Sequence, residues 1–256
     1  MESGETGVIG AHIPWGALDT RRGTLASRIV AEVRSAVLDK KLRAGDFLGT
    51  EKDLASRFGV SRMAARDAMR TLEGMGIVEI KMGGGGGARI ARGNPRSFAE
   101  ALSVQLDLAG VTPQEILDAQ RSVECMAAEL AAENATPEDN AQLVSLLTEA
   151  ESDLDDLDAF TRASHAFHLA IAEASHNRAL VFQLISLQHV SWPERNRTLT
   201  RDVAEKVLDA HRKLAAAIAA RDGAACRLLM EEHVGMIRAR RVAEHRAATE
   251  SGPSCF

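Results

Sequence analysis

Three histidines stand in apolar helical surroundings that could bring their rings together. His168, His211 and His233 each have leucine, isoleucine or methionine three or four residues away, so each side chain should point toward a core. A single inward histidine is usually a core residue whose ring has found a hydrogen-bond partner. Three inward histidines on three helices can instead converge as neutral imidazole ligands of a transition metal. Spacing alone leaves both interpretations open.

Three arginines form a second group with chemical potential. Arg62, Arg66 and Arg70 recur every four residues along one stripe of an expected helix. The other side of that helix is mostly apolar, with Ala64, Ala65, Met69 and Leu72. Arginine is well suited to paired hydrogen bonds on O6 and N7 of guanine, so the stripe could read DNA bases. The alternative is a solvated helix face.

Five consecutive glycines, residues 83–87, separate two short stretches that read as strands, 76–81 and 88–92. A phosphate-binding loop of the Walker type would need Gly-Lys-Ser or Gly-Lys-Thr at the start of a helix, and here alanine and arginine follow. The glycines therefore indicate the tip of a β-hairpin, where they allow unusual dihedral angles and a close approach to DNA. Lys81 and Arg89 could meet phosphates on either side.

The elements that precede this hairpin place the arginines in a recognisable arrangement. Residues 24–42 read as an amphipathic helix, and residues 43–50 break it. Thr50 and Asp53 form a near capping box for a short second helix, a turn follows at residues 59–60, and Ser61 is a good N-cap for the third helix. Two short helices joined by a tight turn predict a helix-turn-helix, whose second helix enters the DNA major groove. The hairpin makes it a winged helix.

The rest of the chain reads as all helix. Residues 92–97 mark a linker, and few glycines and much alanine follow. Helices are expected near 98–109, 113–134, 138–156, 158–175, 178–190, 201–220 and 223–247, and Pro113 and Pro137 follow threonines as expected at helix starts. We predict a mainly α protein with these parts: a disordered tail (1–20), a winged helix (21–92), a linker (93–97), a helical bundle (98–247) and a second tail (248–256).

Charge is distributed unevenly. Residues 21–96 hold 16 Lys and Arg against 8 Asp and Glu, a net of +8, whereas the remainder holds 15 against 28, a net of −13. Only the basic part offers counterion release on a polyanion. No stretch has the length of a membrane span, no signal peptide is evident, and Cys125, Cys226 and Cys255 form no CxxC pair. A cytoplasmic protein with reduced thiols is expected.

Residues 42–81, LRAGDFLGTEKDLASRFGVSRMAARDAMRTLEGMGIVEIK, resemble the winged helix of GntR-family transcription regulators. The family typically has proline where Ala44 stands and arginine where Lys52 stands, and lysine cannot make a forked contact. Carried over by position, the resemblance implies DNA contacts at Lys52, Ser61, Arg62, Arg66 and the wing glycines Gly83, Gly84 and Gly85.

The segments LDAQRSVECMAAELAAENAT, FHLAIAEASHN and AHRKLAAAIAARDGAACRLLMEEH resemble the FCD effector domain of the FadR subfamily. This resemblance implies a divalent metal, zinc or nickel, on His168, His211 and His233. The family's aspartate ligand falls on Ser164, so the site lacks one charge, and we expect weak metal binding or none unless His165 substitutes.

The same resemblance implies an effector pocket that includes Arg121, Asn177 and Ser164. For Arg121 the alternative is an ion pair with Glu124 or another neighbour. Loss of the aspartate makes the metal-free branch of the family, which binds long-chain acyl-coenzyme A, more plausible here.

Together these observations predict a dimeric repressor that binds double-stranded DNA at a palindrome and responds to a small carboxylate or a fatty acyl-coenzyme A. It is not expected to be an enzyme or a membrane protein. The alternative is a metal-dependent enzyme in which the three histidines activate water, but no paired general acid and base stand near them. A nucleic-acid-binding structural protein without an effector is a third possibility, disfavoured by the polar residues expected inside the bundle.

Overall fold

The computed structural model describes residues 23–81, 83, 86–191 and 199–250. The chain divides into two compact units, with the boundary between Ser97 and Phe98. The predicted tail at residues 1–20, the wing residues Gly84 and Gly85, and residues 251–256 of the second predicted tail lie outside the described residues.

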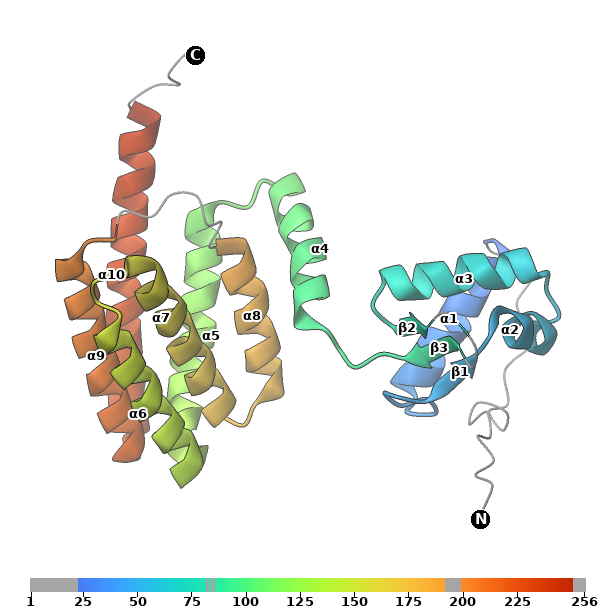
Figure 1. The fold of residues 1–256 in the computed structure, drawn as a ribbon. Helices are drawn as coiled ribbons and strands as arrows, with labels where there is room; N and C mark the ends of the chain where they lie inside the picture. Colours follow the sequence, from blue (N-terminus) through green and yellow to red (C-terminus); the bar gives the residue numbers. More distant parts are fainter. Residues whose placement is uncertain (1–22, 82, 84–85, 192–198, 251–256) are drawn as a thin grey trace. The chain divides into compact units, whose positions relative to one another are not determined.

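Three helices form most of the first unit: α1 (Leu25–Leu38), α2 (Glu51–Phe58) and α3 (Arg62–Gly74). Both α1 and α2 pack against α3 (Figure 1). Their contact surfaces form one core that includes Ile29, Val33, Leu54, Met69 and Leu72. The first helix ends four residues before the predicted position 42 because Lys40 has a positive φ of 59°, which lies outside the helical region.

A small antiparallel sheet completes this unit. Its strands are β1 (Phe47–Gly49), β2 (Val78–Lys81) and β3 (Gly87–Ile90), in the order β1-β3-β2. The predicted hairpin is confirmed: β2 pairs with β3 so that Val78 lies opposite Ile90 and Lys81 opposite Gly87. The sequence did not predict β1, which lies in the segment expected only to break the first helix. The winged helix-turn-helix is therefore present, with one strand more than expected.

Local capping explains where several helices begin. Thr50 accepts a hydrogen bond from the backbone of Asp53, and the Asp53 carboxylate accepts one from the backbone of Thr50, so the capping box of α2 is complete. Ser61 caps α3 by accepting from the backbone N–H of Ala64. Such side chains satisfy N–H groups that have no partner within the helix. The turn between α2 and α3 follows directly from the left-handed Gly59.

The second unit is entirely helical in its described part, as predicted. Its helices are α4 (Pro95–Leu108), α5 (Pro113–Asn134), α6 (Pro137–Ser152), α7 (Leu157–Ala174), α8 (Arg178–Ser191), α9 (Arg201–Ala219) and α10 (Gly223–Glu250). The first of them begins inside the predicted linker 93–97, within the first unit. The last continues to Glu250, three residues beyond the predicted end of the bundle at 247.

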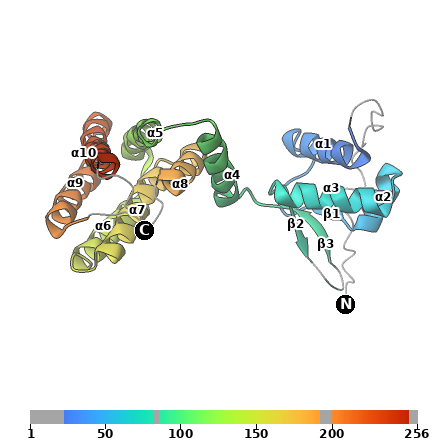
Figure 2. The same ribbon diagram turned by 90° about the horizontal axis from the view of Figure 1, so that it is seen from above.

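Helix α5 is the centre of the bundle. It packs against α7, α8, α9 and α10, while α6 packs against α7 and α9 (Figure 2). The main core contains many alanines, among them Ala128, Ala131 and Ala132 of α5, and these small side chains let the neighbouring helices approach closely. Within the described part of the chain, no helix has both the length and the apolar character required to cross a membrane.

Candidate functional site

Helix α3 presents its three arginines on its exposed side. Arg62, Arg66 and Arg70 are exposed, as the sequence predicted. The buried side consists of Ala65, Ala68, Met69 and Leu72, while Ala64 is only partly buried. Ser61, which precedes α3 and is also expected at DNA, already uses its hydroxyl oxygen to cap the helix. The first turn of α3 thus offers a backbone fixed by its cap and the exposed side chain of Arg62.

An unexpected carboxylate lies among these arginines. Glu51, the first residue of α2, accepts hydrogen bonds from Nε of Arg66 at 2.8 Å and from Nη2 of Arg66 at 2.9 Å. Hydrogen bonding to Arg66 and the charges of Arg66, Arg70 and Arg62 outweigh slight desolvation and hold the pKa of Glu51 below its ordinary value. Glu51 is therefore ionised at the face where DNA contacts are expected.

The remaining residues expected at DNA lie on α2 and the wing. Lys52 is exposed on α2, and Lys81 and Gly83 are exposed at the wing. Arg89 points elsewhere: its guanidinium lies 5.1 Å from the centre of the Phe47 ring, and Nη1 donates to the carbonyl oxygen of Gly45 at 3.1 Å. Arg89 thus binds β3 to the start of β1, which leaves Lys81 as the freer cation for a phosphate.

Two of the wing glycines are required by the packing of the hairpin. A Cβ atom on Gly87 would lie 2.8 Å from Cε2 of Phe47, and Gly87 has a φ of +144°. On Gly86 a Cβ atom would lie 2.3 Å from the carbonyl oxygen of Lys81. A side chain at position 86 would require a backbone shift, and one at position 87 would displace the Phe47 ring and strain the backbone. The end of the glycine run therefore shapes the loop end of the hairpin.

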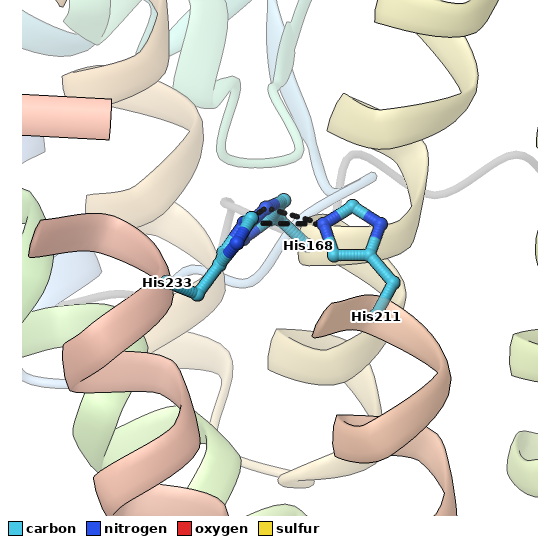
Figure 3. Close-up of side chains that lie close together, drawn as sticks. All are labelled: His168, His211 and His233. Atoms are coloured by element: carbon cyan, nitrogen blue, oxygen red, sulfur yellow. Dashed lines mark hydrogen bonds between the residues drawn. The ribbon is translucent and has the colours of Figure 1, made fainter. Parts of the chain in front are cut away.

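In the helical unit the three histidines converge (Figure 3). The Nε2 atom of His168 lies 3.1 Å from Nε2 of His233 and 3.2 Å from Nε2 of His211, and the last two atoms are 3.2 Å apart. The rings come from α7, α9 and α10 and are 6%, 0% and 1% exposed for His168, His211 and His233. Of the described residues, these form the group that could hold a metal ion.

A buried carboxylate stands behind this triad. Oε2 of Glu124, on α5, lies 2.5 Å from Nδ1 of His168, and Oε1 accepts from Nε2 of Gln120 at 2.6 Å. Burial raises the pKa of Glu124, but the charge of the His168 ring and the hydrogen bonds from His168 and Gln120 outweigh it, so the pKa lies below its usual value. At 2.5 Å the Glu124 carboxylate accepts the Nδ1 proton of His168, so the neutral ring that a metal binds keeps its lone pair on Nε2, directed at the other two rings.

The other two rings are held neutral by burial. Desolvation, with the charge of His168 as a smaller cause, lowers the pKa of His233 to about 3. Desolvation and the neighbouring His168 and His233 lower the pKa of His211 well below its usual value. Neutral imidazole is the form that binds a metal.

A cavity of about 210 Å³ opens beside the triad at His233. Ser164, the residue at the family's aspartate position, lines this cavity, and so does His165. The cavity has an apolar wall made of Phe160, Leu199, Val203, Val207, Met236 and Ile237, and its other polar groups are Thr161, Lys206 and Arg240. Ser164 thus lines the same cavity as His233 of the triad, whereas His165 is not one of the converging ligands.

The structure does not bring Arg121 and Asn177 to this cavity. The guanidinium of Arg121 is 39% exposed and lies 3.9 Å from both Asp118 and Glu231. Oδ1 of Asn177 accepts from the backbone N–H groups of Ala179 and Leu180, at the start of α8. Their proposed roles in effector binding stay predictions without geometric support, and both residues have structural partners instead.

Sequence reasoning missed Glu51 and Glu124. Glu124 carried one usable signal: it lies on the apolar face of α5, with Gln120 one turn before it and Ala128 one turn after it, all buried. A carboxylate on such a face is rarely buried without a partner. Glu51 carried no comparable signal, because an acidic residue in the first turn of a helix is ordinary.

Two family models match the chain. Residues 25–87 match the model described as "Bacterial regulatory proteins, gntR family", and residues 115–236 match the FCD domain. The GntR match covers the winged unit as far as the first residue of β3. The FCD match includes the histidine triad, Glu124 and part of the cavity wall.

Similar proteins carry both units. The Uxu operon regulator of Haemophilus influenzae is 32% identical over 76% of this chain and 73% of its own length. The HTH-type transcriptional regulator LutR of Bacillus subtilis is 29% identical over 76% of this chain and 90% of its own length. Among solved structures, Streptococcus agalactiae GntR superposes with a TM-score of 0.63 at 21% identity, over 84% of this chain and 99% of that one, which supports the fold.

Proposed function

Because the chain belongs to the GntR family of bacterial regulatory proteins and carries an FCD domain, we propose that it is a cytoplasmic repressor that binds a palindromic operator as a homodimer. The chain is a ligand-responsive DNA-binding transcriptional regulator. What carries the finer proposal is the combination of an exposed arginine face on α3 with a buried histidine triad beside a cavity. A single winged helix buries too little surface for strong specificity, which supports two copies on one operator.

We further propose that the triad holds zinc or nickel. Two nitrogens bound to one tetrahedral zinc at ~2.0 to 2.1 Å lie about 3.3 Å apart, close to the 3.1 to 3.2 Å between the Nε2 atoms here. A metal binds imidazole in its neutral form, and at these distances the three Nε2 lone pairs would then be directed at one cation. His168, His211 and His233 fit the metal, which would act as a Lewis acid toward an anionic ligand.

Glu124 changes the charge balance expected from the sequence. Ser164 supplies no negative charge, but Glu124 contributes one at the far side of His168 and makes that ring a stronger donor. Nδ1 of His211 and Nδ1 of His233 have no hydrogen-bond partner among the described residues. Glu124 thus orients His168 alone, and its charge supports metal binding despite the missing aspartate.

The effector we propose is a small organic acid. A carboxylate supplies the anionic ligand that Ser164 lacks, whereas a thioester is neutral and does not. Lys206 and Arg240 add positive charge to the cavity, and its apolar wall suits a hydrocarbon part of the molecule. Metal and acid would then bind cooperatively, since each completes the surroundings of the other.

The metal-dependent enzyme has no comparable support. The relatives are named as regulators, and the carboxylate nearest the triad is hydrogen-bonded to Nδ1 of His168, on the side of the ring opposite the Nε2 cluster. A general base for a metal-bound water would have to face the cavity instead.

The experiment that tests the proposed function has two parts. Native mass spectrometry of the purified protein identifies what the helical unit retains, and DNA binding is then measured with and without that compound. A metal together with an organic acid that changes operator affinity supports the proposal. A fatty acyl thioester without metal would contradict it, and turnover of the compound would favour the enzyme.

A further inference from the structure

The ion pair between Glu51 and Arg66 joins the two helices of the helix-turn-helix. Glu51 begins α2, and Arg66 lies on the second turn of α3. Both carboxylate oxygens take part, each with its own N–H group of the guanidinium. The contact therefore fixes the orientation of the planar guanidinium as well as its position.

Fold stability does not explain this contact. The side chains of Arg66 and Glu51 are 54% and 36% exposed, and exposed ion pairs contribute little to folding. The unit is held together by an apolar core that includes Leu54 of α2 and Leu72 of α3. The helix dipole favours an acidic residue at position 51, but it does not require the paired geometry with one particular arginine.

The geometry leaves a useful part of Arg66 free. A guanidinium carries five N–H groups, and Glu51 uses one on Nε and one on Nη2. The remaining groups, one on Nη2 and two on Nη1, form the outer edge, whose two parallel donors match O6 and N7 of guanine. Arg66 can thus hold Glu51 and a guanine simultaneously, and its side chain is already ordered before DNA arrives.

The negative charge of Glu51 weakens the non-specific binding of this face to DNA. A carboxylate beside Arg62, Arg66 and Arg70 reduces the attraction of this face for phosphates of any sequence. A guanine at the right position recovers that loss through its contact with Arg66, while other bases do not. The pair thus lowers the affinity for DNA of any sequence and favours the sequence that places a guanine at Arg66.

We propose that Glu51 is a specificity-determining positioning residue, which holds the Nε and Nη2 edge of Arg66 so that its outer edge reads a guanine in the major groove. This inference rests on the proposed operator binding. It assigns Glu51 no direct contact with DNA, so its effect on sequence preference must pass through Arg66.

The test uses the full-length protein and two DNA duplexes. Wild-type protein selects its preferred duplex from a random pool, and the second duplex has the same composition in scrambled order. We expect Glu51→Gln to lower the ratio of selected to scrambled affinity about tenfold, within the range for one good arginine–guanine pair. Glu51→Ala should do the same or more, and part of the change should be tighter binding of the scrambled duplex.

Glu73→Gln is the matched control, because it removes one negative charge from exposed α3 without touching Arg66. It should shift the affinities for both duplexes by the same factor. The decisive variant is Glu51→Gln combined with Arg66→Ala, whose ratio should equal that of Arg66→Ala alone, since coupled residues are not additive. Thermal unfolding of each variant should match wild type because both side chains are exposed.

The inference is overturned if Glu51→Gln shifts both affinities equally, as the control does, or if its effect adds to that of Arg66→Ala. A wild-type protein that selects no duplex at all would instead refute the proposed operator binding, so the two failures can be told apart.

Discussion

Nδ1 of His168 lies 2.5 Å from Oε2 of Glu124, and both side chains are buried. This contact fixes which nitrogen of His168 carries the proton and directs its Nε2 atom to the other two rings. A carboxylate behind a metal-binding histidine typically changes metal affinity by about 10- to 100-fold.

We therefore expect Glu124→Gln to bind zinc about 10- to 100-fold more weakly than wild type, because glutamine keeps the shape and loses the charge. Calorimetry at fixed pH measures the dissociation constants. Glu129→Gln is the control on the same helix, since Glu129 pairs with Arg227 away from the triad. Equal affinities of all three proteins would show that Glu124 only fills the core.

Restoring a carboxylate at the family's aspartate position should strengthen the metal site. Ser164→Asp should raise the affinity for zinc or nickel, and His211→Ala should abolish binding, because two neutral imidazoles hold the cation poorly. Elemental analysis after gel filtration measures the metal content, and His189→Ala controls for an exposed histidine. Identical content in Ser164→Asp, His211→Ala and wild type would mean that these histidines are packing residues only.

Replacing Lys52 or Arg62 by alanine should impair DNA binding in different ways. Lys52→Ala should weaken binding to all sequences alike and lower the slope of log affinity against log salt by about one unit. Arg62→Ala should reduce the preference for the selected duplex, by about 1 to 3 kcal/mol for a lost guanine contact. Arg66→Ala should behave as Arg62→Ala does. A salt titration on both duplexes distinguishes these results. An unchanged preference in Arg62→Ala would mean that α3 does not lie in the major groove with Arg62 at the bases.

The wing should depend on Gly87 more than on glycines elsewhere. Gly87→Ala would push a methyl group against the Phe47 ring at a φ of +144°, and such strain costs on the order of 1 to 3 kcal/mol. Gly74→Ala, in α3 with open space around its Cβ position, should stabilise the protein slightly. The melting temperatures of the two variants should move in opposite directions, and DNA affinity should fall only for Gly87→Ala. A Gly87→Ala protein with wild-type stability and affinity would show that this packing is not needed by the wing.

The oligomeric state is also testable directly. At micromolar concentration we expect sedimentation equilibrium to give about twice the monomer mass of 27.5 kDa, because two winged units are needed for a palindrome. A monomer that binds a palindromic duplex with full affinity would contradict the proposed dimer.

Helix starts could be predicted from the sequence because their causes are local. Thr112 and Thr136, each followed by proline, form complete capping boxes with Glu115 and Asp139. Helix α5 begins at the expected residue, and α6 begins one residue before the expected position 138. Strand β1 was missed because its three residues form a strand only through pairing with β3, about forty positions further along the chain.

The candidate site also has features that local sequence predicts and features that depend on contacts between distant residues. The inward direction of His168, His211 and His233 follows from helical periodicity, and the resemblance to the FCD domain suggested their convergence. The partners Glu124 and His168 are 44 residues apart, and Glu51 and Arg66 are 15 apart. Those contacts depend on how the helices pack against one another, and the periodicity of a single helix carries no information about that packing.

The carboxylate of Glu51 beside the arginines of α3 also bears on how quickly a regulator finds its operator. A genome offers about 10⁶ to 10⁹ competing sites, and a strongly cationic face would spend most of its time on them. An acidic group at that face shortens each unproductive stay, so more positions are sampled per unit time by sliding and hopping. The same side chain would thereby set the time needed to reoccupy an operator after the effector is withdrawn.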